Sequence, residues 1–183
     1  MDVLWFRLSR QAGDPVDPMG RFDAGRIFIM LNRGDYWQCG FVITKGSRDQ
    51  LESKGLSAFR ESVATLAPFA RDRVSELREW ESIKLLTVQV DRLRQWHRAG
   101  LLCIGDAAHA MSPVGGVGIN LAIQDAVAAA NILAEPLNAG KLATEDLQRV
   151  QARREWPTKL TQQVQLIVQN RVIKTTLGRT APV

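Results

Sequence analysis

Residues 101–126 read LLCIGDAAHAMSPVGGVGINLAIQDA and contain the densest cluster of structural signals in the chain. The apolar residues 101–104 predict a short strand of the kind that is buried on both faces. Gly105 lets the backbone turn closely where this strand ends. Asp106 then stands at the carboxyl end of the strand, where ligands of such sheets bind, and its carboxylate can accept hydrogen bonds from ligand hydroxyl groups.

A glycine-rich turn follows and leads into a helix. Gly115, Gly116 and Gly118 carry no side chains, so a flat ligand can approach the peptide units directly. We predict a helix from about residue 118 to 134, ended by Pro136. Its first N–H groups and its partial positive charge suit an anionic ligand, and Asn120 in the first turn can donate or accept a hydrogen bond toward the same edge.

The upstream half predicts an antiparallel sheet followed by helices. Strands are expected over 3–8, 26–31, 36–44 and 83–90. A four-residue turn containing Gly34 joins the second and third of these, which predicts an antiparallel hairpin. Helices are expected from a cap at Ser57, from Pro68 to about Trp80, and from a cap at Thr144 to about Thr175 with a kink near Pro157. The fold class is therefore α+β with one α/β-like element.

The composition of the chain argues against several classes of protein. The chain has 183 residues, 45% of them hydrophobic and 23% charged, which indicates a folded globular protein. Its net charge of +5 is scattered and accompanied by no reader motif, so we expect no nucleic-acid binding. No signal peptide is recognisable, and no unbroken apolar run reaches the roughly 18 residues of a membrane span. Cys39 and Cys103 are expected to be buried, reduced thiols, which fits a cytoplasmic protein, and two His with two Cys make no metal set.

The order G-D-A-A-H, P-x-x-G-x-G-x-N and A-x-x-D-A resembles a known motif. It is similar to the C-terminal flavin motif of the FAD-dependent monooxygenases of the aromatic-ring hydroxylase family, the p-hydroxybenzoate hydroxylase-like enzymes. The matching residues are Gly105, Asp106, Ala107, His109, Pro113, Gly116, Gly118, Asn120, Ala122, Asp125 and Ala126. The resemblance implies FAD as cofactor, NAD(P)H as transient reductant, and hydroxylation of an aromatic or similar small substrate with O2.

The resemblance also implies roles for individual residues. Asp106 would bind the ribityl hydroxyl groups, and the backbone from Gly116 to Asn120 would contact the pyrimidine end of the isoalloxazine ring. Pro113 would lie close to the ring where oxygen reacts, which makes it the candidate catalytic position. His109 is expected to be packed or hydrogen-bonded. The full set of expected cofactor-binding residues is Gly105, Asp106, Pro113, Gly115, Gly116, Val117, Gly118, Ile119 and Asn120.

The hairpin strand 36–44 is expected to form a substrate wall. Alternation places Tyr36, Gln38, Gly40 and Val42 on one face and Trp37, Cys39, Phe41 and Ile43 on the other. Tyr36 and Gln38 are the substrate-side candidates. Within the same superfamily a halogenase or a reductase-like dehydrogenase remains an alternative.

Two features expected of such an enzyme are missing from the sequence. No G-x-G-x-x-G precedes Gly105, and the family's central Asp-Gly motif is absent. We therefore expect an incomplete FAD-binding fold, with a partial substrate domain over 1–100, a C-terminal FAD-binding segment over 101–137 and a helical tail over 138–183. Such a chain should bind FAD weakly or not at all, and should either self-associate or take a partner that supplies the N-terminal half. The alternative is a truncated, catalytically incompetent remnant or interaction module.

Overall fold

The computed structural model describes residues 1–23 and 25–177, and these form two compact units. One unit comprises Met1–Val88 together with the chain from Asn170 onward, and the other comprises Gln89–Gln169. Each unit is described by itself. The expected division into segments 1–100, 101–137 and 138–183 stays a prediction.

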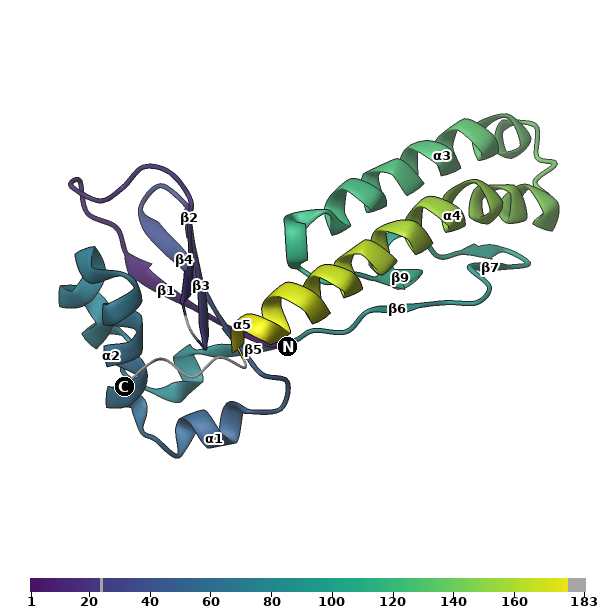
Figure 1. Ribbon diagram of the computed structural model, residues 1–183. Helices are drawn as coiled ribbons and strands as arrows, with labels where there is room; N and C mark the ends of the chain where they lie inside the picture. Colours follow the sequence, from purple (N-terminus) through teal and green to yellow (C-terminus); the bar gives the residue numbers. More distant parts are fainter. Residues whose placement is uncertain (24, 178–183) are drawn as a thin grey trace. The chain divides into compact units, whose positions relative to one another are not determined.

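The first unit is built on an antiparallel sheet with the strand order β2-β3-β4-β1-β5 (Figure 1). The strands are β1 (Asp2–Ser9), β2 (Met19–Asp23), β3 (Arg26–Asn32), β4 (Tyr36–Ile43) and β5 (Lys84–Thr87). The expected β3–β4 hairpin is confirmed, with Phe28 opposite Phe41 and Met30 opposite Cys39. The strand expected over 83–90 is shorter than predicted, and β2 lies in a stretch for which no strand was expected.

Helices cover one face of this sheet. They are α1 (Arg48–Glu52) and α2 (Leu56–Leu66), followed by a 3₁₀ helix over Pro68–Glu76. Phe59 of α2 inserts between Phe6 and Phe41, with ring centroids 5.6 and 5.3 Å away. Gly55, not Ser57, is the N-cap residue of α2, so the expected cap position is wrong by two residues. The core of this unit therefore lies between one sheet face and α2.

A buried ion pair anchors the loop after β1. The guanidinium of Arg73 donates to both carboxylate oxygens of Asp14, and Trp37 Nε1 donates to the same carboxylate at 2.8 Å. The hydrogen bonds from Arg73 lower the pKa of Asp14 from 3.8 to about 2. The loop is thus tied both to the 3₁₀ helix and to the core tryptophan of β4.

The second unit is a helical hairpin with two short β-ribbons. α3 (Gly118–Asn138) and α4 (Thr144–Val168) lie side by side (Figure 1). The ribbons pair β6 (Asp91–Arg92) with β9 (His109–Ala110) and β7 (His97–Arg98) with β8 (Leu101–Leu102). A π-helical turn (Gln169–Ile173) and α5 (Lys174–Leu177) follow α4 in the chain, and from Asn170 onward they belong to the first unit.

Three local expectations in this unit are wrong. The strand expected over 101–104 shrinks to β8, and Leu101 is 43% exposed because β8 pairs only with β7 in the described chain. Pro136 lies inside α3, whose last turn still closes through Ala139 N and Glu135 O at 3.0 Å. Thr144 is the first helical residue of α4 and not its cap, and Asp146 holds the Ala143 amide at 3.1 Å.

One helical segment meets the length and hydropathy criteria for a membrane span. This segment is Val114–Asn138. The mean hydropathy of its 18-residue apolar stretch is 1.4, and 17% of that stretch is buried. The segment contains no unbroken apolar run of this length, because Gln124, Asp125 and Asn131 interrupt it, although they add only one charge. Length and composition alone are weak evidence for a membrane, since core helices of soluble proteins pass the same test.

Candidate functional site

The turn at Gly105 fits only glycine. Its φ is +57°, and a Cβ added there would lie 3.0 Å from the Cβ of Ala122. Ala122 stands one helical turn after Gly118, the first residue of α3. The 3₁₀ turn Gly105–Ala107 therefore packs directly against the start of α3.

Asp106 projects from this turn into solvent. Its side chain is exposed, and within the described part of the chain its carboxylate forms no hydrogen bond. Gly105 beside it is buried, so the backbone is fixed while the carboxylate stays available. A free carboxylate on a rigid turn is suited to accept hydrogen bonds from hydroxyl groups.

The loop before α3 presents bare backbone. Gly115 and Gly116 have φ values of +78° and +62°, both are exposed, and a Cβ added at Gly116 would have nothing within 4 Å. Among the residues that the structure describes, no side chain caps α3. The N–H groups of its first turn are thus available to an anionic ligand, and the helix dipole favours negative charge there.

These features fit a flavin. The exposed carboxylate of Asp106 is an acceptor of the kind that ribityl hydroxyl groups need, and the glycine loop leaves open space in which a flat ring would fit. The uncapped amides of α3 match the electron-rich edge of an isoalloxazine. All nine residues expected to hold the cofactor lie in the second unit, on the turn beside α3, on the loop before it, or in its first turn.

Behind the turn lies a buried polar network. Asp125 of α3 is fully buried, and its Oδ2 accepts from Gly105 N at 3.0 Å and from His109 Nε2 at 2.6 Å. Its Oδ1 accepts from Arg154 Nε of α4 at 2.7 Å. His109 is 1% exposed and, as expected, hydrogen-bonded. Sequence reasoning missed Arg154, because no local pattern marks a contact between residues 29 positions apart.

Tyr36 and Gln38 lie on the sheet face opposite the helices. The other residues of β4, such as Trp37 and Phe41, belong to the core beneath α2. Arg7 stacks its guanidinium 4.6 Å from the centroid of the Tyr36 ring, and Gln38 Nε2 donates to Phe6 O at 3.2 Å. Both candidates are half-buried, so they remain partly accessible within their unit.

Trp5 is a residue of this face that sequence reasoning missed. It stands opposite Gly40 in the sheet register, and a Cβ at Gly40 would lie 3.3 Å from the Trp5 ring. The missing side chain of Gly40 thus lets the indole approach the backbone of β4 closely. The signal was available, because a glycine inside a strand often marks the close approach of another group.

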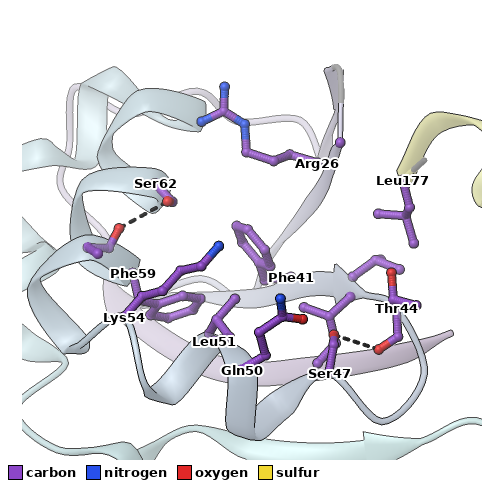
Figure 2. A pocket seen from close by; sticks show the side chains of 14 residues that line it. Arg26, Phe41, Thr44, Ser47, Gln50, Leu51, Lys54, Phe59, Ser62 and Leu177 are labelled. Atoms are coloured by element: carbon purple, nitrogen blue, oxygen red, sulfur yellow. Dashed lines mark hydrogen bonds between the residues drawn. The ribbon is translucent and has the colours of Figure 1, made fainter. Parts of the chain in front are cut away.

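A pocket of about 280 Å³ lies on the helix-covered side of the same sheet. Among its lining residues, Figure 2 shows Phe41 near the centre, Lys54 beside Phe59, and Arg26 above them. Because Phe41 is part of the helix-covered core face, the pocket does not include Tyr36 or Gln38.

Among the residues that the structure describes, no group of three or more His, Cys, Asp or Glu side chains is placed to hold a metal ion.

Comparison with known proteins identifies the family. Residues 1–163 match the family described as FAD binding domain. The chain is 35% identical over 176 residues to 6-methylpretetramide 4-monooxygenase of Streptomyces rimosus, an alignment that covers 96% of this chain and 42% of that protein. The chain thus spans less than half the length of this curated relative.

Solved structures agree on the fold. The crystal structure of PqsL from Pseudomonas aeruginosa superposes with a TM-score of 0.74 at 16% identity, over 96% of this chain and 50% of that one. 2-Methyl-3-hydroxypyridine-5-carboxylic acid oxygenase also gives a TM-score of 0.74, at 16% identity, over 95% of this chain and 48% of that one. The expected mixture of helices and an antiparallel sheet is therefore the arrangement found in FAD-binding monooxygenases. The chain belongs to the FAD-binding domain family, and its sequence and fold are similar to those of the flavoprotein monooxygenases named above.

Proposed function

We propose that this chain forms the flavin-ring and substrate side of an FAD-dependent monooxygenase that uses NAD(P)H and O2. The observation that carries the proposal is the second-unit geometry, in which the Gly105–Asp106 turn packs one helical turn from the uncapped, glycine-preceded start of α3. Its substrate is an aromatic or similar small organic molecule. The pyridine ring in the name of 2-methyl-3-hydroxypyridine-5-carboxylic acid oxygenase supports this substrate class.

In this proposal, the residues of the Gly105–Asp106 turn, the glycine loop and the start of α3 have distinct binding roles. Asp106 accepts hydrogen bonds from the ribityl hydroxyl groups, and the amides from Val117 to Asn120 donate to the pyrimidine edge. Pro113 is exposed beside the glycine loop and lines the ring where oxygen reacts. Its backbone nitrogen carries no N–H group that could hydrogen-bond the oxygen. When bound, FAD supplies the redox chemistry, accepting a hydride from NAD(P)H and activating O2.

The open sheet face supplies the substrate wall in this proposal. Tyr36 offers a phenol hydroxyl that can hydrogen-bond a polar substituent, and its ring is held in place by Arg7. Gln38 and the Trp5 ring over Gly40 complete a surface that is part polar and part aromatic. A surface of this kind orients a flat substrate and excludes water from its faces.

The cofactor assignment is tested by titrating FAD into the chain and following flavin fluorescence and absorbance. We expect weak, saturable binding that Asp106→Asn weakens about tenfold, because a charged acceptor is lost. Asp49→Asn, an exposed carboxylate of α1, is the matched control and should bind as the wild type does. Binding that is unaffected by Asp106→Asn contradicts the assignment.

The oxygenase assignment is tested by O2 uptake. With FAD and NADPH present, uptake should rise when candidate phenols are added, and hydroxylated product should form. Uptake that yields only hydrogen peroxide with every phenol contradicts the substrate class and favours a reductase-like role.

We further propose that the exposed face of α3 docks the remaining half of the FAD-binding fold. Ile119, Ile123 and Val127 are 69%, 56% and 54% exposed, and the only ionisable residue between Gly118 and Ala134 is the buried Asp125. Solved relatives are about twice as long as this chain, so a further half of the fold exists in them. An exposed strip without charge marks a contact surface. This face is also the observation that favours the interaction-module alternative.

A further inference from the structure

Asp125 forms hydrogen bonds with both ends of the turn that carries Asp106. Gly105 lies one residue before Asp106, and His109 lies three residues after it. Both reach the same oxygen of Asp125, from Gly105 N at 3.0 Å and from His109 Nε2 at 2.6 Å. One carboxylate oxygen therefore holds the two ends of the turn together.

The carboxylate is itself held in place. Arg154 Nε donates to Asp125 Oδ1 at 2.7 Å, and Arg154 Nη2 donates to Gln124 Oε1 at 2.9 Å. The side chains of Asp125, Arg154 and His109 are 0%, 9% and 1% exposed. The guanidinium balances the carboxylate charge, and a charge-assisted bond in a buried place is strong and directional.

His109 has a defined tautomer in this arrangement. An ionised carboxylate only accepts hydrogen bonds, so His109 Nε2 carries the proton that it donates to Asp125. His109 Nδ1 is buried without a hydrogen-bond partner in the described structure, and the ring packs on Trp96 with centroids 5.1 Å apart. The imidazole is therefore fixed by one hydrogen bond and one ring contact.

We propose that Asp125 is a positioning residue of the flavin site, and that His109 and Arg154 act through it. The three residues hold the 105–109 turn so that the Asp106 carboxylate faces the ligand in one geometry before the ligand arrives. This inference rests on the proposed FAD site, because only there does the direction of Asp106 matter. It assigns to Asp125 no contact with the cofactor.

The test is hydrogen exchange of the full chain, measured by mass spectrometry, with Asp125→Asn as the variant. We expect exchange of the amides from 105 to 110 to rise about tenfold or more, while exchange in the later turns of α3 and in α4 stays as in the wild type. Asp146→Asn is the matched control, since Asp146 also holds a backbone amide and pairs with an arginine. Its effect should be confined to the start of α4.

A second pair of variants covers the case in which Asp125→Asn does not fold. His109→Gln keeps a donor for Asp125, and His109→Leu removes it. Exchange of the turn should stay near the wild-type rate in the first and rise in the second. Equal exchange in all variants, or a rise that spreads evenly over α3 and α4, overturns the positioning role.

FAD titration separates this inference from the proposed function. We expect the loosened variants to bind FAD about tenfold more weakly than the wild type. If the wild type and Asp125→Asn bind FAD equally although the turn has loosened, the positioning role is wrong and the flavin site stands. If the wild type binds no FAD, the flavin site is wrong, and exchange alone decides whether Asp125 holds the turn.

Discussion

At the scale of single residues, two glycines near α3 share a backbone conformation for different reasons. Gly105 and Gly116 both have positive φ, at +57° and +62°. Gly105 is buried against Ala122, whereas nothing lies within 4 Å of a Cβ at Gly116. The first glycine is needed for packing within the protein. The second leaves open space, where the proposed ligand would lie.

Alanine substitutions should separate these two reasons. Gly105→Ala combines backbone strain with a clash at 3.0 Å, so we expect it to lower the free energy of unfolding by about 2–4 kcal/mol. Gly116→Ala adds backbone strain alone and should lower it by about 1 kcal/mol. Urea unfolding followed by circular dichroism measures both values, and equal losses would show that the Ala122 contact adds nothing.

The Asp14–Arg73 pair predicts an acid-sensitive loop. The pKa of Asp14 is lowered from 3.8 to about 2 by Arg73, so its ionised form is favoured in the folded state. The resulting stability is fully present above pH of about 4 and is lost as the pH falls toward about 2; it amounts to about 2 kcal/mol. Asp14→Asn should therefore flatten the dependence of the unfolding free energy on pH in this window. Asp17→Asn, an exposed carboxylate of the same loop, should leave the dependence unchanged.

At the scale of elements, β4 divides its residues between two environments. Cys39 lies on the core face and is fully buried, and this burial raises its pKa to about 12. Cys103, beyond the end of β8, is only half-buried. The expectation that both thiols are buried therefore holds for Cys39 and only in part for Cys103.

Thiol labelling should follow this division. At pH 8 the thiolate fraction of a thiol with a pKa of about 12 is roughly 10⁻⁴, and Cys39 is also inaccessible. We expect the native chain to react quickly at Cys103 and very slowly at Cys39, and the urea-unfolded chain to react at both. Peptide mapping of the labelled sites checks this assignment, and rapid native labelling of Cys39 would show that the α2-covered face opens.

At the scale of the whole molecule, we expect the exposed face of α3 to govern association. A membrane is less suited than a protein to cover this face of α3, because the opposite side of α3 holds the Asp125–Arg154 pair against α4. α4 carries many charged residues, and a charge inside a bilayer is costly. The chain by itself should therefore self-associate through this face when the other half of the fold is not supplied.

Sedimentation velocity tests the association. Ile123→Glu with Val127→Lys should convert the associating chain into a monomer, since charges would have to be buried in the contact. Val16→Glu changes a loop residue that is 73% exposed and should leave association as in the wild type. Co-sedimentation of the wild type with anionic lipid vesicles, lost in the double variant, would instead identify a membrane as the occupant.

The sequence alone determined what depends on local periodicity and backbone chemistry. Alternation over 26–44 located β3 and β4 within a residue, and the glycines and apolar spacing after Pro113 located the start of α3. These features follow from neighbours in the chain, because a strand repeats every two residues and only glycine tolerates such turns. The resemblance to the family, and with it the expected cofactor, followed from residues 105–126.

Tertiary structure alone decided what depends on residues that are distant in the chain. β2 exists because β3 pairs with it, and Leu101 is exposed because β8 has one short partner. Asp125 gained its role because α4 and the 105–109 turn bring Arg154, Gly105 and His109 to one carboxylate. A sequence records such donors and acceptors, but their pairing is fixed only when packing removes water from around them and brings particular donors within reach of particular acceptors.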